Sequence, residues 1–164
     1  MQNLSTLLGE NSGRIEYIVG SIHHVNAIPI DFDHGTFERA LHRASCVANV
    51  VVAEMNATAH GRMDAFLSTY FDAHYRLLER FRPEIIGHFD LCRLYNPELR
   101  FSEFPNAWSK LKRNVLFAIG YGALFEVNAA ALRKGWRTSF PGEDVAAVRT
   151  PPLDCLAFFY VCRS

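Results

Sequence analysis

The stretch FRPEIIGHFD, residues 81–90, contains the transition on which the fold assignment depends. Pro83 ends a helical pattern, the apolar run 85–86 follows, and Gly87 leads directly to His88. A short continuous apolar run that ends at a turn residue is typical of a parallel strand buried on both faces. The sequence therefore predicts a short buried strand with polar side chains at its end.

Similar transitions occur before and after this stretch. Apolar residues at the three-and-four spacing of an amphipathic helix separate the strand-like runs. Strand, helix, strand, helix, strand is the order of a parallel α/β fold with crossover helices. Residues 45–61 fit either a helix or a strand and loop, because β-branched residues and alanines conflict there. The expected elements are strand 15–19, helix 63–81, strand 85–86, helix 108–119, strand 124–127 and a weak helix over 144–149.

Polar residues follow the predicted strands, at the edge where parallel α/β folds collect their chemistry. His23 follows the first strand, His88 and Asp90 follow the second, and Glu126 and Asn128 end the third on one shared face. Imidazole and carboxylate are good ligands for zinc, iron or manganese, and clustered metals can activate water against a phosphate ester. Spacing alone leaves this open, because a single histidine is more often a capping or core residue and no HxH, HExxH or CxxC motif occurs.

Composition limits the class of protein. With 164 residues and 49% apolar residues, the chain can bury one core, which favours a single domain. Lys and Arg total 17 and Asp and Glu total 17, so no broad field attracts nucleic acid or anionic lipid. Four scattered cysteines predict reduced thiols, and no window approaches the roughly 18 apolar residues of a membrane span. We expect a soluble, cytoplasmic protein.

Three ordered blocks carry a resemblance to a known family. They are GSIHHVNAIPIDFD at 20–33, IIGHFDLCRL at 85–94, and FEVNAAALRKG at 125–135 followed by FP at 140–141. Together they resemble the histidinol-phosphatases of the PHP superfamily, particularly the fungal form, over roughly residues 15–145. The resemblance implies an α/β fold that is part of a distorted (β/α)7 barrel, with divalent zinc, iron or manganese at its mouth. It also implies a small-molecule substrate, L-histidinol phosphate, hydrolysed in histidine biosynthesis.

The resemblance also implies roles for individual residues. His23 and His88 match metal ligands of the family. His24 falls where the family tolerates an aromatic residue, so we expect it to line the substrate site or to lie behind the metal ligands. Asp90 is our candidate catalytic residue, orienting a metal-bound histidine or water, with turn stabilisation as an equal alternative.

The block after the third strand supplies the substrate contacts. Asn128 is predicted to bind substrate, and Arg133 to grip phosphate oxygens, with Lys134 as the second choice. In the alternative, both basic residues only solvate a loop. For Glu126 we favour a hydrogen-bonding residue of the barrel wall over a water-orienting base. The remaining histidines are expected in loops or on helix surfaces, without chemistry: His34, His42, His60 and His74.

The departures from the family matter as well. Its HxH motif on the first strand, a metal-bridging glutamate and a closing Asp and His are not found in this chain. We therefore interpret residues 1–150 as a partial barrel domain, incomplete at both ends, and 151–164 as an atypical C-terminal tail. Two main hypotheses follow: a metal-dependent phosphomonoesterase that lacks part of its site, or an inactive fragment or pseudoenzyme that serves as an interaction module. A third hypothesis keeps the superfamily but changes the substrate to another phosphoester, because a fold does not determine a function. The isolated chain is expected to be inactive or nearly so.

Overall fold

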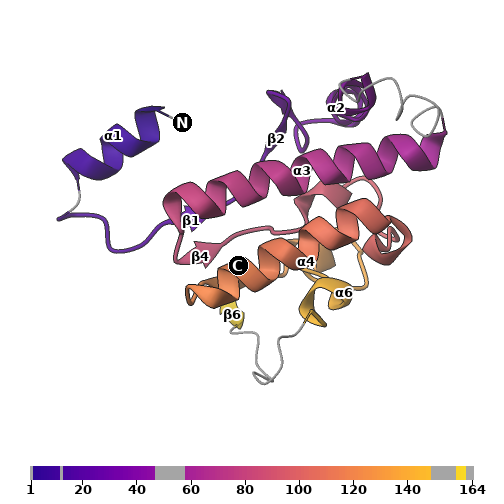
Figure 1. The fold of residues 1–164 in the computed structure, drawn as a ribbon. Coiled ribbons are helices and arrows are strands. Elements are labelled where there is room, and N and C mark those ends of the chain that lie inside the picture. Colours follow the sequence, from indigo (N-terminus) through magenta and orange to yellow (C-terminus); the bar gives the residue numbers. More distant parts are fainter. Residues whose placement is uncertain (1, 12, 47–57, 149–157, 162–164) are drawn as a thin grey trace.

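A computed structural model describes residues 2–11, 13–46, 58–148 and 158–161 (Figure 1). None of the helices in these ranges is long and apolar enough to cross a membrane. The elements in chain order are α1 (Gln2–Glu10), β1 (Val19–Gly20), β2 (His24–Val25), β3 (Ile28–Pro29), α2 (His34–Cys46), α3 (Ala59–Phe81), β4 (Ile85–Ile86), η3 (Leu91–Arg93), η4 (Phe101–Glu103), α4 (Pro105–Gly120), β5 (Leu124–Asn128), α5 (Ala130–Arg133), α6 (Glu143–Ala146) and β6 (Phe158–Val161).

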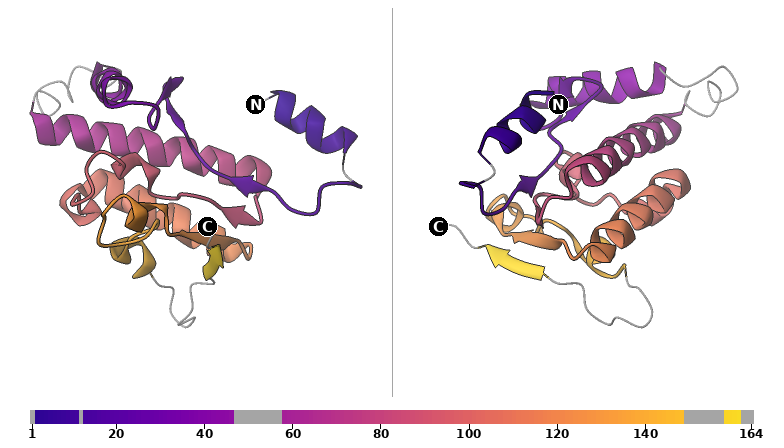
Figure 2. Two further views of the ribbon diagram at one scale, coloured as in Figure 1. Left: turned by 180° about the vertical axis from the view of Figure 1, so that it is seen from behind. Right: turned by 60° about the vertical axis from the view of Figure 1, so that its left-hand side comes forward.

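The main sheet has the strand order β1-β4-β5-β6, and every neighbouring pair is parallel. This confirms the expected parallel α/β arrangement. Helices α3 and α4, which connect β1 to β4 and β4 to β5, lie on the same side of the sheet (Figure 2). Within the described ranges the sheet is open and closes no barrel, so the structure is a mixed α/β fold with a small parallel sheet.

Helix α3 begins and ends where the sequence provides stop signals. Thr58 caps its start by accepting a hydrogen bond from the Gly61 N–H at 3.0 Å, a common N-cap contact. Arg82 ends it in the left-handed conformation, φ 41°, immediately before Pro83. The predicted helix 63–81 is thus confirmed and begins four residues earlier.

Helix α4 is tied to α3 at both polar and apolar contacts. Asp64 of α3 accepts from the Ala107 N–H at 3.1 Å, which satisfies one of the unpaired donors at the start of α4. Further along, the Asn114 side chain donates to the Phe71 carbonyl at 2.7 Å. These bonds fix the two helices against each other while their apolar stripes form the core.

The core is rich in aromatic side chains that connect the helices to the sheet. Phe89 packs on Phe71 and on Phe125 of β5, with ring centroids 5.8 and 5.4 Å apart. His74 lies among them, fully buried, with its ring 4.8 Å from that of Phe89. The expectation of a surface position for His74 is wrong, because this residue shares the buried stripe of α3.

A β-hairpin between β1 and α2 was not predicted from the sequence. Strands β2 and β3 pair antiparallel, and Asn26 and Ala27 connect them with φ values of 50° and 63°. Two successive positive φ values are typical of a type I′ hairpin turn. The hairpin folds the chain back, so that Asp31 lies beside His23.

The remaining differences concern element boundaries. The predicted strand 15–19 overlaps β1 only at Val19, because β1 consists of Val19 and Gly20, and strand 124–127 extends by one residue in β5. Helix α2 occupies residues that were not assigned to any element. Residues 47–57 of the ambiguous segment and the end of the predicted helix 144–149 lie outside the described residues. Four residues of the expected tail form β6 beside β5.

Candidate functional site

His23 and His88 meet at one small pocket beyond the ends of β1 and β4. Their ring centroids are 5.9 Å apart, with the planes at 90°. The two rings come from separate parallel strands whose ends lie at the same edge of the sheet, which is why they can converge. The pocket, of about 180 Å³, is lined by His23, Asp31, His88, Leu91, Leu94, Asn128, Ala130, Lys134 and Phe140.

The hairpin positions the His23 ring between two polar side chains. Nδ1 of His23 lies 2.7 Å from Oδ2 of Asp31, and Nε2 lies 2.9 Å from the Ser21 hydroxyl. The backbone N–H of Ile30 donates to the His23 carbonyl at 3.0 Å, which fixes the two arms of the hairpin. Asp31 was missed by sequence reasoning, although it belongs to the block at residues 20–33 that carries the resemblance.

His88 follows β4 in an unusual backbone conformation, with φ of 46°. Oε2 of Glu126 accepts from its backbone N–H at 3.2 Å and lies 2.9 Å from its ring Nδ1. The Tyr70 hydroxyl donates to the carbonyls of His88 and Phe89, at 3.4 and 3.2 Å. Contacts from two sides therefore hold this residue in a conformation that is uncommon for a side chain other than glycine.

Asn128 contributes to the same pocket from the end of β5. Its Nδ2 donates to Oε1 of Glu126 at 3.1 Å and lies 3.3 Å from Nδ1 of His88. The bond between Asn128 and Glu126 shows that the two side chains share one face of β5, as predicted. Glu126 thus contacts His88 directly instead of serving only as part of a wall.

The structure reverses the order of the two basic candidates and displaces His24. Lys134 lines the pocket, whereas Arg133, at the end of α5, does not. His24 is exposed on β2, where alternation turns it away from buried Val25, and it lies outside the pocket lining. Arg133 and His24 are therefore not among the residues that line this pocket, and their substrate contacts stay predictions.

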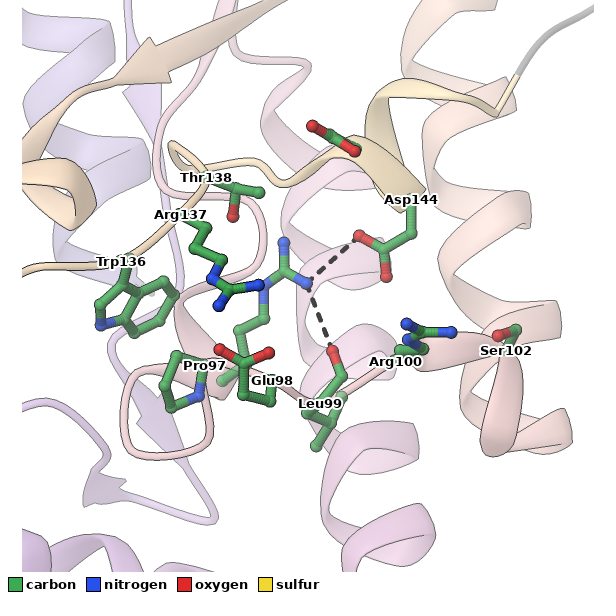
Figure 3. A pocket seen from close by; sticks show the side chains of 11 residues that line it. Pro97, Glu98, Leu99, Arg100, Ser102, Trp136, Arg137, Thr138 and Asp144 are labelled. Atoms are coloured by element: carbon green, nitrogen blue, oxygen red, sulfur yellow. Dashed lines mark hydrogen bonds and ion pairs between the residues drawn. The ribbon is translucent and has the colours of Figure 1, made fainter.

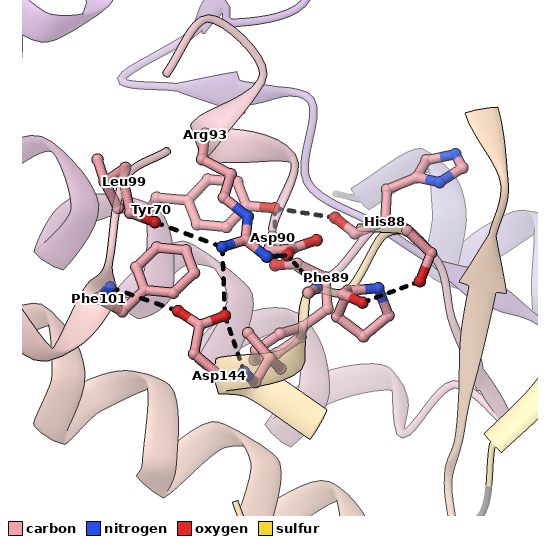
Figure 4. A network of polar contacts seen from close by, with 12 residues as sticks. Tyr70, His88, Phe89, Asp90, Arg93, Leu99, Phe101 and Asp144 are labelled. Carbon is pink, nitrogen blue, oxygen red and sulfur yellow. Dashed lines mark hydrogen bonds and ion pairs between the residues drawn. The ribbon is translucent and has the colours of Figure 1, made fainter. Parts of the chain in front are cut away.

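Asp90 is buried on the other side of its loop, away from the pocket. In Figure 4 the His88 imidazole points away from Asp90, whose carboxylate pairs with Arg93. Oδ2 also accepts from the Gly142 N–H at 2.8 Å. Burial raises the pKa of the Asp90 carboxyl, and the Arg93 charge opposes that shift. The geometry supports the alternative role, in which Asp90 stabilises the loop.

Arg93 connects this loop to α6. Its guanidinium also lies 3.2 Å from Asp144 and donates to the Leu99 carbonyl at 3.4 Å (Figure 4). A Cβ added at Gly142 would overlap this guanidinium, so any larger residue there requires Arg93 to move from its buried position. The ion pair between Arg93 and Asp90 is almost fully buried, whereas Asp144 is partly exposed. Together the two ion pairs hold the loop after β4 against α6.

A second, larger cavity of about 530 Å³ lies beside Arg93, and Figure 3 looks into it. It contains no histidine, and its three arginines are matched by three acidic side chains. Among the described residues, no three His, Cys, Asp or Glu side chains are grouped so that they could hold a metal ion, here or elsewhere. Its lining residues are Arg93, Pro97, Glu98, Leu99, Arg100, Ser102, Trp136, Arg137, Thr138, Glu143 and Asp144.

The donors of the histidine pocket fit part of a metal site. Within the residues that the structure describes, no three His, Cys, Asp or Glu side chains form a ready set of ligands. His23 and His88 nevertheless offer two imidazoles to one pocket, and each has Nδ1 against a carboxylate. A carboxylate behind the ring is the usual environment of a metal-ligating histidine. Further ligands would be needed to complete a coordination shell.

Comparisons with known proteins agree with the sequence blocks. A probable histidinol-phosphatase of Schizosaccharomyces pombe is 37% identical over 130 residues, which cover 77% of this chain and 38% of that protein. A histidinol-phosphatase of Saccharomyces cerevisiae is 30% identical over 159 residues, covering 84% of this chain and 43% of the relative. No protein-family model and no solved structure matches the chain. The chain spans about two fifths of the length of these curated relatives, and it belongs to the histidinol-phosphatase family.

Proposed function

We propose that this chain carries part of the active site of a metal-dependent phosphomonoesterase, which hydrolyses L-histidinol phosphate to L-histidinol and phosphate. The observation that carries the proposal is the convergence of His23 and His88 on one pocket, in a chain related to two fungal histidinol-phosphatases. The substrate is taken from the names of those relatives. The free thiols of Cys46 and Cys92 fit a reducing compartment, and we place the reaction in the cytoplasm.

A divalent ion such as zinc, iron or manganese would supply a bound water of lowered pKa and withdraw charge from the phosphate group. His23 and His88 would hold the ion through neutral ring nitrogens. Lys134 at the pocket would attract the phosphate oxygens, and it is better placed for that contact than Arg133. Asn128 would keep Glu126 in place through its amide, which donates to Oε1.

The expected activity of the chain alone is low. Among the described residues the pocket offers two imidazoles, fewer ligands than catalytic metal sites of known enzymes use, so metal binding should be weak and turnover slow. The experiment measures phosphate release from L-histidinol phosphate after chelation and reloading with zinc, iron or manganese. We expect slow release that requires the metal and that is lost in His23→Gln and in His88→Gln.

His24→Gln is the matched control, because His24 neighbours His23 in sequence but is exposed and outside the pocket. This variant should keep both metal affinity and turnover. Metal binding without any phosphate release would overturn the catalytic proposal and favour the non-catalytic module. Metal binding that is unaffected by His23→Gln and His88→Gln would overturn the site itself.

A further inference from the structure

Two carboxylates hold the two pocket imidazoles by the same ring atom. Oδ2 of Asp31 lies 2.7 Å from Nδ1 of His23, and Oε2 of Glu126 lies 2.9 Å from Nδ1 of His88. We infer that Asp31 and Glu126 are positioning residues that each keep a proton on Nδ1 of their histidine and leave Nε2 as the ligand-binding atom. The inference deepens the proposed function and rests on it for the identity of the ligand.

The protonation pattern follows from what each atom can do. An ionised carboxylate only accepts hydrogen bonds, so an imidazole nitrogen that bonds to it carries the proton. Nδ1 of His88 also lies 3.3 Å from the Asn128 amide nitrogen, but the contact with Oε2 of Glu126 is shorter, at 2.9 Å, and the amide already donates to Oε1 of Glu126. We therefore assign the Nδ1 proton of His88 from the shorter contact. In a neutral imidazole the other nitrogen then has a free lone pair. For His23 this assignment also agrees with the Ser21 hydroxyl, which can donate to Nε2 at 2.9 Å. In both histidines Nε2 is therefore the unprotonated nitrogen; at His23 it accepts from the Ser21 hydroxyl, which has to rotate away when a ligand binds.

Glu126 fixes the backbone of His88 as well as its ring. The same Oε2 accepts from the His88 backbone N–H at 3.2 Å, where φ is 46°. Its other oxygen accepts from Asn128 at 3.1 Å, and its side chain is only 14% exposed. A Cβ at Gly87 would lie 3.3 Å from Oε2, so the glycine gives the carboxylate room. Glu126 is thus held rigidly enough to orient His88.

Asp31 reaches its histidine by a different route. It lies eight residues after His23 and is brought back by the hairpin, whereas Glu126 comes from a strand 38 residues beyond His88. Two unrelated segments therefore place an acceptor behind two rings that face one pocket. A role limited to stabilising the hairpin would explain Asp31 alone and would predict no equivalent carboxylate behind His88.

The first measurement reads the ring protons directly in metal-free protein. Long-range 1H–15N NMR spectra at pH 8 distinguish the two neutral forms of each imidazole, and spectra of His23→Gln and His88→Gln assign the signals. We expect the Nδ1-protonated form for both histidines. Asp31→Ala should change the form of His23 only, and Glu126→Ala that of His88 only.

Conservative variants separate the hydrogen bond from the charge. Asp31→Asn and Glu126→Gln retain an oxygen that can accept from Nδ1, so they should preserve the ring form. They also provide folded alternatives if an alanine variant fails to fold by circular dichroism. Asp33→Asn is the control, because Asp33 caps α2 through Thr36 and does not contact either ring.

The second measurement is Zn²⁺ affinity, by competition with a chromophoric chelator. Loss of a carboxylate behind a ligating histidine typically weakens metal binding about 10–100-fold, which we expect for Asp31→Ala and Glu126→Ala. Asp33→Asn should have no effect. Unchanged ring forms in the alanine variants, or unchanged Zn²⁺ affinity, would overturn the inference. If the unsubstituted chain bound no Zn²⁺, the proposed metal site would fail, while the metal-free spectra would still test the carboxylate pairs.

Discussion

Replacing His74 with leucine should stabilise the protein, and more so in acid. His74 is fully buried in α3, and neither ring nitrogen has a hydrogen-bond partner. A buried polar group without a partner costs about 1–3 kcal/mol, and the ring contact with Phe89 returns about 1 kcal/mol. Leucine has a similar volume and no polar atoms. At neutral pH we therefore expect His74→Leu to raise the free energy of unfolding by about 1 kcal/mol.

The pH dependence follows from the protonation of the same ring. Burial lowers the pKa of His74 to about 3, whereas an unfolded histidine has a pKa of about 6.5. Above pH 6.5 both states are neutral and His74 adds no pH dependence. Between pH 6.5 and 3 the unfolded state binds a proton that the folded state does not, so stability falls by about 1.4 kcal/mol per pH unit. At pH 5 this amounts to about 2 kcal/mol, which His74→Leu should recover.

Urea unfolding followed by circular dichroism at pH 8, 6 and 5 measures the difference between the two proteins. Other titrating groups contribute equally to both and cancel in that difference. His42→Leu is the control, because His42 is exposed on α2 and the same substitution there should leave the pH dependence unchanged. The gain in free energy of unfolding from His74→Leu should be larger at pH 5 than at pH 8. If it is not, His74 is not a buried neutral group.

Three further substitutions test the contacts that shape the fold. Gly142→Ala should lower the free energy of unfolding by at least about 2 kcal/mol, because the new methyl group displaces the Arg93 guanidinium from its buried pairs; thermal unfolding measures this. Ala27→Gly should raise the free energy of unfolding by up to about 1 kcal/mol, because φ is 63° at this exposed turn position and glycine adopts that conformation without strain. Urea unfolding measures the gain, and no gain would show that Ala27 is not strained. Asp72→Asn should cost no more than about 1 kcal/mol, since its pair with Lys110 is partly exposed, and the loss should shrink in high salt.

The parallel sheet and its crossover helices could be predicted because their signals are local. Strand β1 ends at Gly20, β4 is followed by Gly87 and β5 ends at Asn128, and α3 and α4 carry clear apolar stripes. Buried His74 was misjudged because its residue type suggested a surface position, although it lies four residues after Tyr70 on the buried face of α3. The β2–β3 hairpin was missed because Ala27 adopts a left-handed conformation that sequence preference does not indicate.

The two histidines of the pocket could be found from strand ends, but their partners could not. Asp31 reaches His23 only because an unpredicted hairpin reverses the chain. The choice of Arg133 over Lys134 followed the geometry of guanidinium and phosphate, yet the turn of α5 brings Lys134 to the pocket. The directions of the Arg133 and Lys134 side chains depend on the residues at which α5 begins and ends. The sequence block alone does not determine those residues.

Asp90 affects the pocket even though it lies outside it. Its carboxylate accepts from the Gly142 N–H, two residues after Phe140, which lines the pocket. Phe140 in turn exchanges two backbone hydrogen bonds with Asn128, at 2.7 and 3.0 Å. The loop that begins with His88 therefore supplies one wall of the pocket directly and, through Asp90, anchors the opposite wall. The position of His88, a proposed metal ligand, and the buried ion pair between Asp90 and Arg93 thus depend on the conformation of the same loop. A change that breaks the ion pair should therefore also displace His88.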